Sequence, residues 1–142
     1  MTQCKTQKSP ILIIDDDPSH LHIYCLVLES AGFCAQPVLV TRKGIELPEI
    51  ETPHAVLLDY CLTVGIRARD IARLVKSRYP TVPILLLSDL PVAPADIEPF
   101  IKDFVRKGNP EQLVTTLHGI VRPAGSGPAP RLLDPDSRSP EL

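Results

Sequence analysis

The sequence predicts an α/β fold built on a doubly wound, five-stranded parallel sheet, and two kinds of observation support this prediction. First, short continuous runs of Ile, Val and Leu recur at 11–14, 55–58 and 84–87. Apolar runs of this length are typical of parallel strands that are buried on both faces. Second, segments with helical spacing of apolar residues separate these runs, which indicates β-α units.

The first strand is predicted at 11–14, and a helix start follows it directly. Asp17 can cap a helix, and Pro18 fits the first helical position. Apolar residues then recur at helical spacing as far as Gly32, which fits a helix stop. The opening of the chain therefore predicts one β-α unit.

The next β-α unit has weaker signals. A strand is predicted at 33–38, where Pro37 favours a position at the edge of the sheet. A second helix is expected over 41–50, although Pro48 shortens it. We therefore expect a short helix within 41–50.

The second half of the chain alternates strands and helices more clearly. Strands are predicted at 55–58, 82–87 and 101–105, and helices at 68–78 and 110–121. The segment 90–100 stands where a fourth helix is expected, but it contains three prolines. Because proline removes a backbone donor and fixes φ, at most one or two helical turns are expected there.

Composition places the chain among ordinary soluble domains. It has 142 residues, 44% apolar residues and a net charge of −2, so nothing indicates bulk attraction to nucleic acid or to a membrane surface. We expect a flexible N-terminus over 1–9, one domain over 10–121, and a disordered, proline-rich tail over 122–142. The polar start and the four cysteines, none in C-x-x-C spacing, predict a cytoplasmic protein with free thiols.

Five polar residues stand at or just after the ends of predicted strands: Asp15, Asp16, Asp59, Ser88 and Lys107. Because the carboxyl ends of parallel strands share one edge of the sheet, these side chains are expected to meet in one pocket. A cluster of carboxylates repels itself unless a divalent cation lies among them. The four histidines show no metal-ligand spacing, and only His20 and His22 are expected near this pocket.

The order and spacing of four stretches, 11–18, 55–59, 83–88 and 104–107, resemble those of the receiver domains of two-component response regulators. The resemblance covers about residues 10–121. It implies a flavodoxin-like sheet of strand order 2-1-3-4-5.

The resemblance also implies roles for individual residues. Asp59 corresponds to the residue that accepts a phosphoryl group from a histidine kinase or a phosphotransfer protein, and Lys107 to the family's lysine. Ser88 and Phe104 correspond to the hydroxyl and aromatic residues of the switch. Mg²⁺ is the implied cofactor, and its implied ligands are Asp15, Asp16, Asp59 and the backbone carbonyl of Cys61.

Lys107 and Mg²⁺ fit this chemistry, because phosphoryl transfer to a carboxylate requires that negative charge be neutralised. Some positions depart from the family pattern. Thr63 stands in place of a proline, Asp89 in place of a small residue after Ser88, and Gly108 in place of a proline.

Three function classes remain open from the sequence. The leading one is a stand-alone phosphoacceptor domain that signals through protein contacts and catalyses only its own phosphorylation and dephosphorylation. The second is a receiver-like scaffold that acts without phosphorylation. The third is a phosphatase of the haloacid-dehalogenase type, suggested by Asp15-x-Asp17, Ser88 and Lys107. It would need an acidic pair on a later strand, and Glu111 is the only acidic residue between Lys107 and the tail.

Overall fold

The computed structural model describes residues 10–50 and 52–121, and all of the elements below lie within them. In chain order they are β1 (Ile11–Asp15), α1 (Pro18–Ser30), β2 (Ala35–Leu39), β3 (Ala55–Asp59), α2 (Ala68–Arg78), β4 (Ile84–Ser88), the 3-10 turn η1 (Glu98–Phe100), β5 (Asp103–Arg106) and α3 (Pro110–Ile120). The expected flexible N-terminus and disordered tail fall outside the described residues.

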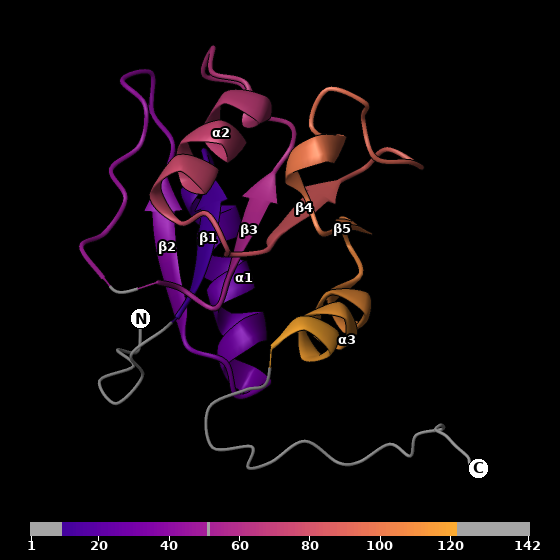
Figure 1. Cartoon of the computed structure of the whole chain (residues 1–142). Coiled ribbons are helices and arrows are strands. Elements are labelled where there is room, and N and C mark those ends of the chain that lie inside the picture. The colour runs from indigo at the N-terminus through magenta and orange to yellow at the C-terminus, as the bar shows by residue number, and fades with distance from the viewer. Residues whose placement is uncertain (1–9, 51, 122–142) are drawn as a thin grey trace.

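The five strands form one parallel sheet of order β2-β1-β3-β4-β5, as the sequence predicts (Figure 1). The three central strands are buried along their full length. This burial explains why their sequences are continuous apolar runs rather than alternating ones. Pro37 lies in β2 at the edge of the sheet, where a missing backbone donor is tolerated.

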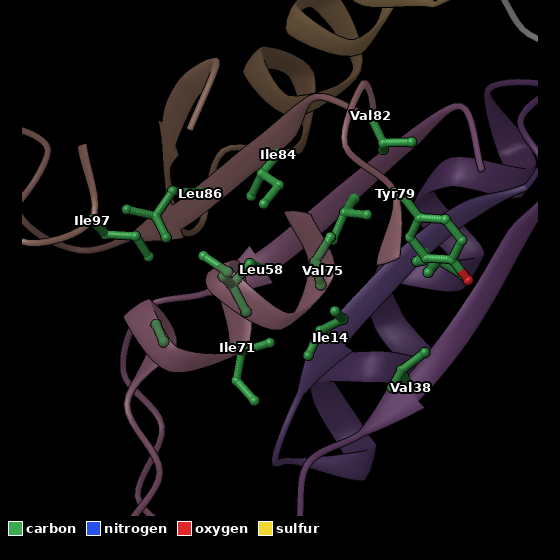
Figure 2. Close-up of a cluster of buried hydrophobic side chains, with 14 of the residues drawn as sticks. Ile14, Val38, Leu58, Ile71, Val75, Tyr79, Val82, Ile84, Leu86 and Ile97 are labelled. Atoms are coloured by element: carbon green, nitrogen blue, oxygen red, sulfur yellow. The ribbon is translucent and has the colours of Figure 1, made fainter. Parts of the chain in front are cut away.

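Two separate apolar clusters lie on the two faces of the sheet. On one face, α1 and α3 pack through Leu21, Leu28, Leu113 and Leu117. On the other face, α2 packs through Ile71 and Val75. Figure 2 shows that the side chains of this second cluster come from α2, the strands and Ile97 of the β4–β5 connection.

The expected helix over 41–50 is wrong. Thr41 and Gly44 instead form a tight turn with two mutual backbone hydrogen bonds of 3.0 and 2.9 Å. Gly44 has φ of 111°, a conformation that glycine adopts readily and that no α-helix contains. The apolar residues after the turn, Ile45, Leu47 and Ile50, pack as an irregular segment against the same cluster as α2.

The fourth helix of the expected fold is reduced to η1, a single 3-10 turn of three residues. This agrees with the effect expected of the three prolines in 90–100. Ile97 at its start is fully buried and Phe100 is partly buried, so the segment still contributes to the core. One face of the sheet therefore carries two helices, and the other carries one helix with two irregular connections.

Two further features bear on the sequence predictions. Among the described residues, no helix has both the length and the apolar character needed to cross a bilayer.

Cys25 and Cys61 are free thiols. Cys34, by contrast, is disulfide-bonded, so the expectation that all four cysteines are free is wrong.

Candidate functional site

Three polar side chains are buried at the carboxyl ends of neighbouring strands. Asp15 ends β1, Asp59 ends β3 and Ser88 ends β4, and each is at most 2% exposed. Every other buried side chain among the described residues is apolar. Because burial of a polar group without a partner is costly, this concentration at one edge of the sheet marks a site.

Asp59 is paired with Lys107, which directly follows β5. Lys107 Nζ lies 2.6 Å from Asp59 Oδ1, and the Cys61 amide donates to the same oxygen at 3.3 Å. The Lys107 amide donates to the Ser88 carbonyl at 3.0 Å, which holds the chain after β5 against β4. Burial alone would lower the pKa of Lys107, but the hydrogen bond and charge of Asp59 outweigh it and raise that pKa.

Asp15 is the carboxylate whose protonation is most affected. Burial, followed by the negative charge of Asp59, raises its pKa from 3.8 to about 7. Asp15 Oδ1 accepts a hydrogen bond from the Asp17 amide at 3.1 Å, and Oδ2 lies 3.2 Å from His20 Nδ1. Asp15 therefore favours its protonated form unless a cation lies beside it.

Asp16 is directed toward a different partner. Its Oδ2 accepts two hydrogen bonds from Thr63, one from the backbone amide and one from Oγ1, both 2.8 Å long. Partial burial would raise the pKa of Asp16, but the two bonds from Thr63 lower it. Asp16 is therefore ionised and held by the β3–α2 connection, at the position where the family pattern has a proline.

Ser88 and Phe104 lie on adjacent strands and on the same face of the sheet. Phe104 pairs with Leu86, which is two residues before Ser88 and therefore points to the same side. Ser88 is fully buried and its Oγ accepts the Leu90 amide at 3.0 Å. Phe104 is partly buried against the α2-side cluster, so the two predicted switch residues lie on the same side of neighbouring strands.

One group of side chains among the described residues is arranged so that it could hold a metal ion: Asp15, His20 and Asp59, with one ligand atom from each lying within 4.8 Å of the others. Two buried carboxylates are the donor set that a divalent cation would neutralise, so the residues present fit the Mg²⁺ that the family implies. Ligation by Asp16 and by the Cys61 carbonyl stays a prediction.

His20 is the site residue that sequence reasoning did not assign. The search for metal-ligand spacing among histidines missed it because its partners are aspartates. The usable signal is that His20 follows Asp15 by five residues across a strand-to-helix turn. The first turn of α1 thereby returns the ring to the end of β1.

Comparison with known proteins agrees with this fold. No protein-family model matches the chain. It is 28% identical over 130 residues to the DNA-binding response regulator MtrA of Mycolicibacterium smegmatis. That match covers 89% of the chain and 57% of MtrA, so the chain spans little more than half of this relative.

Several solved receiver-type proteins have similar structures. The chemotaxis protein CheY4 of Vibrio cholerae superposes with a TM-score of 0.68 at 18% identity, covering 81% of this chain and 100% of CheY4. A CheY-like receiver domain from Methanospirillum hungatei gives 0.63 at 18% identity, covering 80% and 93%. The BeF3-activated receiver domain of DrrB from Thermotoga maritima gives 0.63 at 24% identity, covering 80% and 97%. In sequence and in fold, the chain is thus similar to response-regulator receiver domains.

Proposed function

We propose that Asp59 accepts a phosphoryl group from a histidine kinase or a phosphotransfer protein, in a reaction that requires Mg²⁺. The observation that carries this proposal is the buried Asp59 carboxylate paired at 2.6 Å with Lys107 beside Asp15. In an ordinary core such a cluster would only destabilise the fold. At the carboxyl edge of a parallel sheet it forms a site for an anionic group and its counter-charges.

The transfer step joins one Asp59 oxygen to phosphorus. As that P–O bond forms, the P–N bond of the donor phosphohistidine breaks and its electron pair returns to the imidazole nitrogen. We assign the attack to Oδ2, because Oδ1 is engaged by Lys107 and the Cys61 amide. Lys107 then exchanges its bond to the carboxylate for one to a phosphoryl oxygen, which stabilises the charge carried by the transferred group.

Ser88 contributes a hydroxyl donor from β4. Its Oγ accepts a hydrogen bond from the Leu90 amide, so its own hydroxyl hydrogen is available to a phosphoryl oxygen. Asp15 and Asp59 would hold Mg²⁺, which supplies positive charge to the phosphoryl oxygens when it is bound. The chain is then a receiver that promotes its own phosphorylation and dephosphorylation rather than an enzyme with a separate substrate.

The signal leaves the domain through protein contacts in the cytoplasm. Tyr60 follows Asp59 directly, and its hydroxyl donates to Asp96 Oδ1 at 3.1 Å. This bond links the end of β3 to the short β4–β5 connection. The connection carries the exposed apolar residues Leu90 and Val92. We assign this surface to the downstream protein partner.

Incubation with acetyl phosphate tests the proposal. With Mg²⁺, intact-protein mass should show one added phosphoryl group, which alkaline hydroxylamine removes because acyl phosphates are labile. The matched variants are Asp59→Asn, which should take up none, and Asp89→Asn, which removes an exposed carboxylate next to Ser88 and should take up at least as much. Equal uptake by Asp59→Asn, or none by the wild-type chain, would refute the assignment, and the second result would favour a scaffold.

A further inference from the structure

His20 adds a nitrogen donor to a pocket that otherwise offers oxygen. Its Nδ1 lies 3.2 Å from Asp15 Oδ2, and the ligand atoms of His20, Asp15 and Asp59 all lie within 4.8 Å of one another. The phosphoryl transfer described above makes no use of this ring. Two carboxylates and one imidazole at these distances can ligate a single ion.

The second nitrogen of the ring also faces a carboxylate. His20 Nε2 lies 3.6 Å from Asp17 Oδ2, and both side chains are 45% exposed. With a cation bound between His20 Nδ1 and Asp15, the Nδ1 lone pair would face the cation, and the ring would carry its proton on Nε2 toward the Asp17 carboxylate. Metal-binding histidines commonly have such a carboxylate behind them, where it fixes the tautomer and the ring orientation.

The position of His20 is set by the same residues that start α1. Asp17 is the N-cap and accepts the Ser19 amide at 2.9 Å, and Pro18 occupies the first helical position. This start holds the first turn of α1 above the end of β1. The ring therefore reaches Asp15 from a rigid helix rather than from a mobile loop.

We propose that His20 is a ligand of the divalent cation at this site and shifts its preference from Mg²⁺ toward first-row transition metals. The inference rests on the proposed function, because the cation concerned is the one that phosphorylation of Asp59 requires. Mg²⁺ takes oxygen ligands and gives up water reluctantly, whereas imidazole suits Co²⁺, Ni²⁺ and Zn²⁺.

The test compares Co²⁺ with Mg²⁺ by calorimetric titration and follows the visible absorption of bound Co²⁺. All variants carry Cys61→Ser, because the exposed Cys61 thiol could bind Co²⁺ by itself. The variant that removes the ligand is His20→Gln. Its matched control is His22→Gln, which changes an exposed histidine of the same helix that belongs to no metal-compatible group among the described residues.

We expect the parent to bind Co²⁺ about tenfold more tightly than Mg²⁺, and His20→Gln to weaken Co²⁺ binding by about tenfold or more. Mg²⁺ binding should weaken by less than about threefold, because Mg²⁺ relies on oxygen ligands. The Co²⁺ absorption should change in His20→Gln and stay the same in His22→Gln. Equal loss for both metals, or unchanged Co²⁺ binding in His20→Gln, would overturn the inference.

Acetyl phosphate uptake with Mg²⁺, measured on the same parent protein, separates this inference from the proposed function. Uptake at Asp59 together with a Co²⁺ preference that does not depend on His20 refutes the ligand assignment and leaves the phosphoacceptor in place. If Co²⁺ is preferred only when His20 is present and Asp59 takes up no phosphoryl group, the ligand assignment is supported and the phosphoacceptor assignment is refuted.

Discussion

The two faces of the sheet are built differently. On one face, α1 and α3 are both capped by side chains, with Asp17 accepting the Ser19 amide and Asn109 the Gln112 amide. On the other face, α2 starts at Arg67 without a side-chain cap, and irregular connections cover the rest (Figure 1). Asp15, Asp59 and Ser88 end strands and Lys107 directly follows one, so the sheet rather than the helices of either face sets their positions. This group of polar side chains is therefore kept although one face carries a single α-helix.

The largest expected effect is on the free energy of unfolding, when one core residue on each face is replaced by alanine. Leu28 of α1 and Ile97 before η1 are both fully buried. Leu28→Ala should cost about 4–5 kcal/mol of unfolding free energy, because a helix packed on the sheet leaves a cavity that cannot close. Ile97→Ala should cost about 2–3 kcal/mol, because the irregular backbone around it can collapse into the space. Urea unfolding measures both, and equal costs would show that the faces are equally rigid.

The next effect is the pH dependence of Mg²⁺ binding at the carboxyl edge of the sheet, where the site lies between the two faces. Burial and the charge of Asp59 raise the pKa of Asp15 to about 7, so Asp15 is protonated below this pH and a bound cation must displace the proton. Apparent Mg²⁺ affinity should therefore fall about tenfold for each pH unit below about 7 and level off above it. Calorimetry over a pH series measures this.

The control for the pH series is His20→Gln. If Asp15 is the titrating group, this variant keeps the same pH dependence. A flat profile in the wild-type chain would contradict the assignment to Asp15.

Substitutions at the helix N-caps should change the free energy of unfolding by smaller amounts, lowering it for α3 on one face and raising it for α2 on the other. Asn109→Ala should lower the unfolding free energy by about 1 kcal/mol, because the Gln112 amide loses its acceptor. Arg67→Asp should raise it by about 0.5–1 kcal/mol, because Arg67 occupies the N-cap of α2 in extended backbone without a side-chain bond. Urea unfolding of both variants is the measurement, and a loss of stability in Arg67→Asp would show that the arginine has another structural role.

The smallest expected effect concerns the bond between Thr63 and Asp16. Thr63→Val removes one of the two donors that bind the Asp16 carboxylate. The pKa of Asp16 should move up toward its ordinary value, and Mg²⁺ affinity should rise by about threefold. Thr81→Val, an exposed threonine before β4, is the control and should leave Mg²⁺ binding unchanged. A weaker Mg²⁺ affinity in Thr63→Val would show that Thr63 supports the site rather than competing with it.

The sequence predicts the features that apolar patterns and strand ends determine, but not those that turn conformation and side-chain orientation determine. The strands and the approach of Lys107 to Asp59 follow from apolar runs and from the shared edge of parallel strands, whereas the strand order follows from the resemblance to receiver domains. The helix over 41–50 was predicted wrongly because a tight turn at Thr41 and Gly44 outweighed the apolar spacing. The direction of Asp16 toward Thr63 depends on loop conformation and side-chain rotamers, which no spacing rule encodes. The approach of His20 to Asp15 was missed although the spacing of five residues across the strand-to-helix turn signals it.

The most direct test of the account is the response of backbone amide signals to beryllofluoride, an acyl-phosphate mimic, in the presence of Mg²⁺. We expect large shifts at Asp59, Ser88 and Phe104. Over 90–100 we expect only small shifts, because the three prolines leave this segment few alternative conformations. Unchanged signals at Asp59 and Ser88 would contradict the phosphoacceptor site, and a large displacement of 90–100 would contradict the rigid, shortened connection.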